Sequence, residues 1–242
     1  MSGDVPVAST HGAERRGPLV HRAVRPGAIL LLLGAFEFTI AMAVAQLGWT
    51  VPYSLLTNYI SDLGAVHCGY FPSSSAHYVC SPWHLVFNVG IVLLGLLLIL
   101  AVLLIQSAFR PGKMRSIGLA CLLLAGIGAI GVGLSPEDVN LTVHEVSALV
   151  AFLFGNLGMI VLGFAMFRDT RWDGFRGYSI ISGLVGFVGL ILYLSKAYGP
   201  LGLGGSERLI VAPILLWAVV VGIHLARIPT YAPSTIRPNV QT

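Results

Sequence analysis

The residues of this chain best suited to chemistry are gathered between positions 58 and 84. The stretch reads NYISDLGAVHCGYFPSSSAHYVCSPWH and holds three of the 7 histidines, two of the 3 cysteines and one carboxylate, Asp62. Imidazole and carboxylate groups can transfer protons or bind a divalent metal ion near neutral pH. Two cysteines in one segment can bind a metal or form a disulfide. The segment is therefore the first candidate for a reactive site.

Cys68 and Cys80 lie in what we expect to be an exported loop, where oxidising surroundings favour a disulfide. The alternatives are a metal site completed by His67 or His77, and two free thiols. The spacing of the two cysteines matches no standard metal-binding pattern. The disulfide is therefore the prediction, and no metal ligand is assigned. The third cysteine, Cys121, is expected to be a small packing residue.

The residues just before these cysteines show helical spacing. Ser54, Asn58 and Asp62 recur every four positions, which places them on one face of a helix with apolar residues on the other. Pro52 suits the start of such a helix and Gly64 suits its end. The pattern predicts a short amphipathic helix in the membrane interface, with its polar face over the top of the bundle.

Further polar residues fall at the same expected depth, at the outer ends of the apolar segments or in the connections between them. They are His84, Asn88, Glu137, Asp138, His144, Glu145 and Glu207. Such a group can hold a divalent metal, act as acid and base, or bind a cationic or hydroxylated headgroup. Our hypothesis assigns catalytic roles, as acid, base or ligand, to Asp62, His84 and His144. It assigns ligand binding to Asn58, Ser61, Asn88, Glu137 and Glu145.

Each of these residues also has a structural explanation. Asp138 is placed to cap the fourth helix, and Glu145 stands where the helix dipole favours a carboxylate. His84, next to Trp83, is placed to anchor the second span at the interface. At the level of sequence both interpretations stay open.

Glu37 is the carboxylate expected within the depth of the bilayer, in the first apolar segment. An ionisable group there is costly and is commonly functional or paired. It shares a helix face with Gly34 and Ala41, so we expect it to point into the bundle, toward Asn156 or Asn88. Its role is either proton or ligand handling, or a structural hydrogen bond between helices.

The elements that must position these residues follow from composition. Of the 242 residues, 56% are hydrophobic and 10% are charged, and the mean hydropathy is +0.85. About a quarter of the residues of a soluble domain are charged, so this composition excludes a soluble domain. Apolar runs long enough to cross a bilayer occur at 27–48, 83–106, 116–134, 142–167, 177–195 and 209–227. We predict an all-α, polytopic bundle of six transmembrane helices with a structured, disulfide-closed first outer loop.

Basic residues predict the orientation. All 14 lysines and arginines except Lys196 and Arg208 fall in the termini or in the connections on one side, which identifies that side as cytoplasmic. Both termini are then cytoplasmic, in a cell membrane. Residues 1–26 form a disordered arm, 27–227 the membrane domain and 228–242 a tail. The pI near 9.2 reflects this topology and indicates no nucleic acid partner.

The first apolar segment has a second interpretation. The sequence RRGPLVHR, the apolar run after it and AVAQ together resemble a signal peptide cleaved after Ala45. Against cleavage, the run is longer than the usual core of a signal peptide and Glu37 interrupts it. An uncleaved first span is the prediction.

Motifs for known cofactors are missing from the sequence. HExxH, a serine elbow and a glycine-rich phosphate loop are absent, and His224 has no partner histidine with which to ligate haem. The cofactor is therefore left unassigned, and so is the reaction.

Two segments carry a resemblance to a known family. NYISDLG, from Asn58 to Gly64, stands in the first outer loop, and VHEVSALVAFLFGN opens the fourth span with His144. With its six spans, the chain resembles the prokaryotic membrane family DUF998 over about residues 27–227. A weaker likeness, through Y-I-S-D-x-G, is to the six-span Frag/DRAM/Sfk group, where Thr tends to stand in place of Leu63. That second likeness implies lipid remodelling, GPI-anchor processing or membrane-lipid regulation.

These observations lead to three hypotheses about function. The preferred one is an integral membrane protein that handles a lipid or lipid-linked headgroup at the extracytoplasmic face, with membrane lipids as partners. The second is a non-catalytic scaffold or regulatory subunit of an unidentified protein partner. The third is a small-solute or proton-coupled carrier that uses Glu37.

Overall fold

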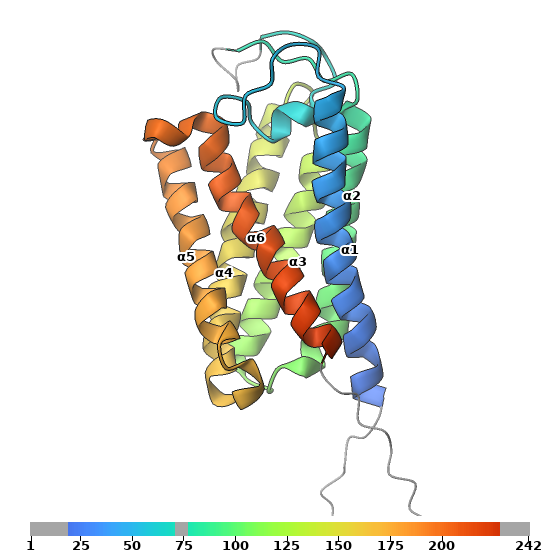
Figure 1. Cartoon of the computed structure of the whole chain (residues 1–242), viewed down its shortest axis with the longest axis vertical. Coiled ribbons are helices and arrows are strands. Elements are labelled where there is room, and N and C mark those ends of the chain that lie inside the picture. Colours follow the sequence, from blue (N-terminus) through green and yellow to red (C-terminus); the bar gives the residue numbers. More distant parts are fainter. Residues whose placement is uncertain (1–18, 71–76, 228–242) are drawn as a thin grey trace, which may run out of the picture.

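The computed structural model describes residues 19–70 and 77–227. Six long helices form one bundle (Figure 1), and each contains a stretch long and apolar enough to cross a membrane. They are α1 (Leu19–Leu47), α2 (His84–Ile105), α3 (Lys113–Leu134), α4 (Leu141–Ala165), α5 (Phe175–Leu194) and α6 (Gly202–Arg227). Within the described ranges the chain forms no strand, only an isolated antiparallel bridge between Gly69 and Val79. The predicted all-α, six-span architecture is confirmed.

The helices form a closed ring in chain order. Each helix packs against the next one along the chain, and α6 packs against both α5 and α1. Small residues permit the close approach, because helices in lipid associate through direct packing rather than through exclusion of water. A Cβ on Gly95 of α2 would lie 2.5 Å from the carbonyl oxygen of Gly126 of α3. A larger residue at Gly95 would therefore force α2 and α3 apart.

Two helix boundaries differ from the prediction. α1 begins at Leu19, inside the stretch expected to be a cytoplasmic arm. α6 begins at Gly202 rather than at residue 209, so Glu207 lies within the helix and not in the connection before it. Hydropathy placed this boundary too late because it counts Glu207 as a water-facing charge, whereas the side chain is buried. The rest of the predicted arm and the predicted tail 228–242 lie outside the described residues.

The connection between α1 and α2 covers one end of the bundle, at the top of Figure 1, while α1 begins and α6 ends at the opposite end. We call its described residues, 48–70 and 77–83, the cap. The predicted amphipathic helix from Pro52 to Gly64 is wrong. This part of the cap contains turns and one short 3-10 helix, η1 (Ser61–Gly64).

Side chains in the cap form hydrogen bonds with backbone N–H groups that a helix would use for its own hydrogen bonds. Asn58 Oδ1 accepts a hydrogen bond from Ser54 N at 3.0 Å, and Asp62 Oδ2 accepts one from Tyr59 N at 2.9 Å. Local bonds of this kind favour turns over helix. The apolar residues of the stretch then turn inward, and Ile60 is only 6% exposed, packed into the core of the bundle. The cap is therefore packed onto the bundle and does not lie in the membrane interface as a separate helix.

Candidate functional site

Asp62 is the central acceptor of the cap. Its side chain is fully buried, and Oδ2 accepts hydrogen bonds from Asn58 Nδ2 at 3.2 Å and from Tyr59 N at 2.9 Å. His77 Nε2 lies 2.6 Å from the same oxygen, and the contact is an ion pair when the imidazole is protonated. Asp62 therefore links the part of the cap before Cys68 to the disulfide-closed loop, in which His77 lies.

Glu207 reaches the cap from α6. Its side chain is 5% exposed and accepts a hydrogen bond from Ile60 N. The neighbouring Arg208 is directed to other groups: its guanidinium donates to the carbonyl oxygen of Asn58 at 2.7 Å and to the Tyr53 hydroxyl at 2.6 Å. The first turns of α6 thus hold the cap through one acidic and one basic side chain, each with its own partners.

Glu137 enters the same region from the connection between α3 and α4. Its side chain is 5% exposed, and Oε2 accepts a hydrogen bond from Ser61 Oγ at 2.8 Å. Burial first, and then the negative charge of the nearby Asp62, raises the pKa of Glu137 well above its usual range. A raised pKa favours the protonated form of this carboxyl group. We call Asp62, Glu137 and Glu207 the acid cluster.

Two oxygens of the acid cluster accept nothing from any donor group in the described chain. They are Asp62 Oδ1 and Glu137 Oε1, on side chains whose residues are 0% and 5% exposed. A buried acceptor without a donor destabilises the protein. Within the described chain, both oxygens therefore remain available to a donor from a bound molecule.

A cavity of about 680 Å³ lies beside the acid cluster. Such a volume falls within the range of small-molecule sites, about 300 to 1,000 Å³. The polar side chains that line it are Tyr59, Ser61, Glu137, His144, Glu145, Tyr193, Lys196, Tyr198 and Glu207. The rest of the lining is apolar and comes from α4, α5 and α6, among them Leu149, Phe152, Leu190 and Leu203. The cavity therefore has a polar side under the cap and an apolar side between helices.

The cavity reaches the lateral surface of the bundle between α4 and α5. Val146 and Leu149 of α4 and Leu194 of α5 line it and are 58%, 41% and 60% exposed. In a chain whose helices span a membrane, such exposed apolar side chains face lipid. A molecule dissolved in the bilayer could thus reach the polar groups without leaving the membrane.

A second, smaller cavity of about 90 Å³ lies deeper, between the helices of the bundle. Ser61, His144 and Glu207 line both cavities, whereas the other lining residues of the small one are apolar. These three side chains therefore stand where the polar region meets the apolar interior.

The predicted site residues divide into two groups. Ser61, Glu137, His144 and Glu145 line the large cavity, and Asp62, which lines neither cavity, is near enough to raise the pKa of Glu137. His144 is 7% exposed, and its Nδ1 donates to the carbonyl oxygen of Ser135 at 2.9 Å.

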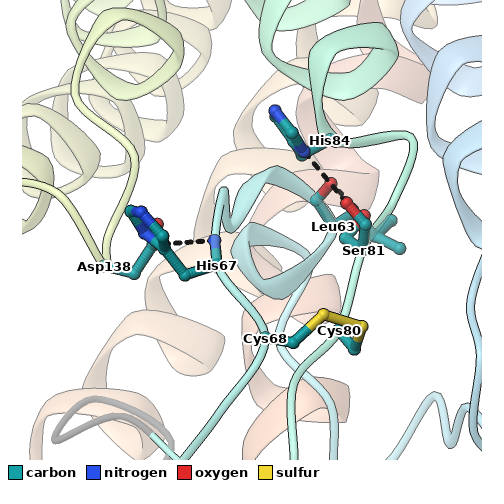
Figure 2. Close-up of a disulfide and its surroundings, with 7 residues drawn as sticks. All are labelled: Leu63, His67, Cys68, Cys80, Ser81, His84 and Asp138. Atoms are coloured by element: carbon teal, nitrogen blue, oxygen red, sulfur yellow. Dashed lines mark hydrogen bonds and ion pairs between the residues drawn. A yellow bond between two sulfur atoms is a disulfide. The ribbon is translucent and has the colours of Figure 1, made fainter.

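The other predicted residues position the cap and line neither cavity. Asn88 Nδ2 donates to the carbonyl oxygen of Gly64 at 2.9 Å. His84 Nδ1 donates to the carbonyl oxygen of Ser81 at 3.1 Å, while Ser81 Oγ donates to that of Leu63 (Figure 2). The structure therefore does not bring His84 to the cavity with His144.

The predicted disulfide is confirmed: the sulfur atoms of Cys68 and Cys80 lie at bonding distance (Figure 2). These cysteines are therefore neither a metal pair nor free thiols. Over residues 19–70 and 77–227, no group of three or more histidine, cysteine, aspartate and glutamate side chains is arranged to hold a metal ion. Cys121 is buried in α3, as expected of a packing residue.

Asp138 serves the cap rather than the fourth helix. It accepts hydrogen bonds from Val66 N at 3.0 Å and from His67 N at 2.7 Å, and His67 Nδ1 lies 2.8 Å away (Figure 2). Burial alone would raise the pKa of Asp138, but these donors together hold it below its usual range. The predicted helix cap is wrong, because Asn140 occupies that position and accepts from Val143 N at 3.2 Å.

Comparison with known proteins places the chain in a family. Residues 32–224 match the family model described as "Protein of unknown function (DUF998)". The chain belongs to the DUF998 family. The match begins in α1 and ends in α6, so it includes the acid cluster and both cavities. A search of curated proteins and one of solved structures found no match, and the likeness to the Frag/DRAM/Sfk group is not shown.

Glu37 of this DUF998 chain has neither of its predicted partners. Asn88 bonds to the cap, and Asn156 Nδ2 donates to the carbonyl oxygens of Phe152 and Ile210. Glu37 is half-buried on α1, close to Gly90 of α2, and its Oε1 has no hydrogen-bond partner in the described chain. The predicted pairing failed because buried asparagines in helices first satisfy backbone carbonyls nearby. Glu37 lines neither cavity.

Sequence reasoning missed several residues of the DUF998 cavity. They are Tyr59, Tyr193, Lys196 and Tyr198, with Glu207 recognised only as an outer acid. A signal for three of them exists in YLSKAY, where two tyrosines and a lysine follow one another at the outer end of the fifth span. Ring centroids of Tyr59 and Tyr193 lie 5.9 Å apart in an edge-on arrangement, which joins the cap to α5.

Proposed function

We propose that this protein binds a membrane lipid in the large cavity, with the headgroup against the acid cluster and the chains between α4 and α5. The observation that carries the proposal is the divided lining of a cavity that reaches the lateral surface. An amphipathic molecule matches such a lining, because its polar part can meet Glu137 and Glu145 while its apolar part contacts Leu149 and Leu190.

The charge distribution supports the same proposal. Ionisable residues within or at the edge of membrane-spanning segments are expensive and are typical of functional sites. Here three carboxyl groups are buried together beside the cavity, at 0%, 5% and 5% exposure. A protein that needed only to stabilise its bundle would gain more from apolar residues at these positions.

The proposal includes an orientation. Basic residues concentrate at the end of the bundle opposite the cap, and such residues mark the cytoplasmic side. The cap, its disulfide and the cavity then face the extracytoplasmic side of the cell membrane, with both termini in the cytoplasm. The bound lipid belongs to the outer leaflet.

The test is native mass spectrometry of the purified chain in mild detergent, with the lipids it retains. We compare Leu149→Trp, which fills the mouth of the cavity, with Leu124→Trp on α3. The two leucines are 41% and 39% exposed, and Leu124 lines neither cavity. Retained lipid in the wild type and in Leu124→Trp, with loss in Leu149→Trp, is expected. Equal retention in all three proteins would refute the proposed site.

A further inference from the structure

We propose that the lipid in this cavity carries a protonated primary amine and a phosphate in its headgroup, with the amine held by Glu137 and Asp62 and the phosphate facing Lys196. The inference rests on the proposed function, because it names the class of lipid for the same cavity. Its basis is the charge of the acid cluster, the buried oxygens without a hydrogen-bond donor, and the position of the single lysine in the cavity lining.

The acid cluster lacks a cation of its own. In the part of the chain that the structure describes, no arginine or lysine forms an ion pair with Asp62, Glu137 or Glu207. Arg208 is nearest in sequence, but its guanidinium donates to carbonyl oxygens and to Tyr53. His77 contacts Asp62 on Oδ2. Glu137 therefore has no cationic partner in the described chain, and a cationic ligand would supply one.

The free acceptors determine what kind of cation fits. Asp62 Oδ1 and Glu137 Oε1 are buried and unpartnered within the described chain, and Glu137 lines the cavity. A primary ammonium brings three N–H donors, as a lysine side chain does. A trimethylammonium brings none and would leave both oxygens unsatisfied. The unpartnered oxygens thus favour a primary amine over a quaternary one.

The ammonium would take the place of the proton that the raised pKa favours on Glu137. When it binds, Glu137 gives up its proton to solvent and the pair carries two negative charges against the positive charge of the ligand. His77 on the far side of Asp62 supports the second charge. The exchange leaves each buried oxygen with a hydrogen-bond donor, which the described chain does not provide.

Lys196 is placed to meet the phosphate. It lies two residues beyond the end of α5 and lines the cavity. It is exposed and forms no ion pair with an acid of the described chain. A lysine binds phosphate as a compact point charge. Glu137 and Lys196 come from different connections on the cap side of the bundle, so the cavity offers one site for each charge of a zwitterion.

The height of the groups fits a lipid that stands upright in the outer leaflet. Lys196 and Glu137 lie beyond the ends of α5 and α3 that adjoin the cap. Leu149, Phe152 and Leu190 lie further along α4 and α5, away from that end. Chains attached to a headgroup at the acid cluster would therefore run between α4 and α5 toward the middle of the bilayer.

The experiment offers the delipidated full chain an equimolar mixture of phosphatidylethanolamine, phosphatidylcholine and phosphatidylglycerol with identical chains, and reads bound lipid by native mass spectrometry. We expect phosphatidylethanolamine to be enriched roughly tenfold, the effect of one charge-assisted contact. Glu137→Gln should remove the enrichment while lipid still binds. Lys196→Met should weaken retention of phosphatidylethanolamine several-fold. Asp173→Asn, an exposed acid at the other end of the bundle, is the control and should keep the wild-type preference.

The outcomes separate this inference from the proposed function. Equal binding of phosphatidylcholine, or a preference for phosphatidylglycerol, in a cavity that Leu149→Trp still blocks would overturn the amine inference and leave lipid binding intact. Lipid binding that Leu149→Trp does not affect would overturn both. Each variant is first compared with the wild type by thermal unfolding. Glu137→Gln keeps the size of the side chain and adds no buried charge, so an unfolded variant is not expected.

Discussion

The two ends of the bundle both bury carboxylates but treat them in opposite ways. At the end opposite the cap, Asp169 is 6% exposed and paired with Arg171, whose Nη2 lies 2.6 Å from Oδ2 and whose Nε lies 3.0 Å from Oδ1. Arg110 adds a second positive charge at 3.8 Å. The hydrogen bonds from Arg171 hold the pKa of Asp169 below its usual range. Under the cap, the pKa of Glu137 is raised.

The pair of Asp169 and Arg171 has a structural role, whereas the acid cluster belongs to the candidate site. Arg171 also donates to the carbonyl oxygen of Ala108, so Asp169 and Arg171 fasten the connection after α4 to the end of α2. Phe109 stacks on Trp172 beside them, with ring centroids 4.7 Å apart. Within the described chain, Asp169 and Asp173 at that end each have an arginine partner. The acid cluster also holds the cap in place, but Asp62 Oδ1 and Glu137 Oε1 have no donor within the described chain, and Glu137 lines a cavity.

The largest expected effect is that of removing Asp62. Asp62→Ala leaves the buried donors of Asn58, Tyr59 and His77 without their acceptor, and we expect the free energy of unfolding to fall by about 3–5 kcal/mol. Asp169→Ala should cost less, because the side chain of Arg171 is 45% exposed and water can solvate it. Unfolding in one detergent, followed by circular dichroism, measures both. A larger loss for Asp169→Ala would reverse the comparison.

The disulfide gives the next largest effect, and it acts at the cap end alone. Cys68→Ser opens a loop with a sequence separation of 12, and we expect a loss of about 2–3 kcal/mol because the unfolded chain gains freedom. A reducing agent should lower the melting temperature of the wild type to that of the variant. Cys68→Ser itself should not respond to the reductant. A response would mean that another group is being reduced, and the assignment would fail.

The six helices were predictable because a membrane demands long apolar runs, and those runs are visible in one dimension. The acid cluster was only partly predictable. Asp62 and Glu137 could be named because each is a rare charge between spans. Their closeness depends on Tyr59 and Ile60 turning inward, which no periodicity shows. The spacing of Ser54, Asn58 and Asp62 predicted a helix. The side chains of Asn58 and Asp62 instead accept hydrogen bonds from nearby backbone N–H groups, which favours turns.

Helix ends were the other source of error, and the reason is again the cap. A charge within a hydropathy window ends a predicted span, so Glu207 and Arg208 were placed before α6. Both residues lie inside α6 because the cap provides partners for them there. Glu207 accepts a hydrogen bond from Ile60 N, and Arg208 donates one to the carbonyl oxygen of Asn58. Asp138 does not cap α4, because its carboxylate accepts hydrogen bonds from Val66 N and His67 N. Asn140 caps the helix instead. Contacts over long sequence separations decided each case.

A pH titration compares the two ends more finely. The folded pKa of Glu137 is raised by burial first and by Asp62 second, so its contribution to stability is present at low pH and is lost as pH rises through that raised pKa. Glu137→Gln cannot ionise. We expect the wild type to lose stability relative to this variant as pH rises from 4.5, the ordinary value for a glutamate, to the raised pKa, by about 1.4 kcal/mol for each unit by which the pKa is raised.

The charged and titratable groups around Glu137 set the conditions of that titration. They are Asp62 and His77 from the cap, His144 and Glu145 from α4, Lys196 after α5, and Glu207 and Arg208 from α6. His144→Gln combined with Glu137→Gln distinguishes an imidazole contribution from that of the carboxyl. Parallel curves for the wild type and Glu137→Gln throughout the range above pH 4.5, the ordinary value for a glutamate, would contradict the raised pKa.

The smallest effect is expected for an ion pair that resembles the acid cluster in composition but not in burial. Asp173 Oδ1 lies 3.4 Å from Arg176 Nη1, and the two side chains are 61% and 40% exposed. Water already solvates both charges, so Asp173→Ala should change the free energy of unfolding by less than about 0.5 kcal/mol. Arg176 also lies 5.0 Å from the centroid of the Phe167 ring, and this contact survives in the variant. The measurement is the same detergent unfolding at low and at high salt. A loss of stability comparable with that of Asp62→Ala would show that burial does not set the ranking, and the contrast between the two ends would lose its physical basis.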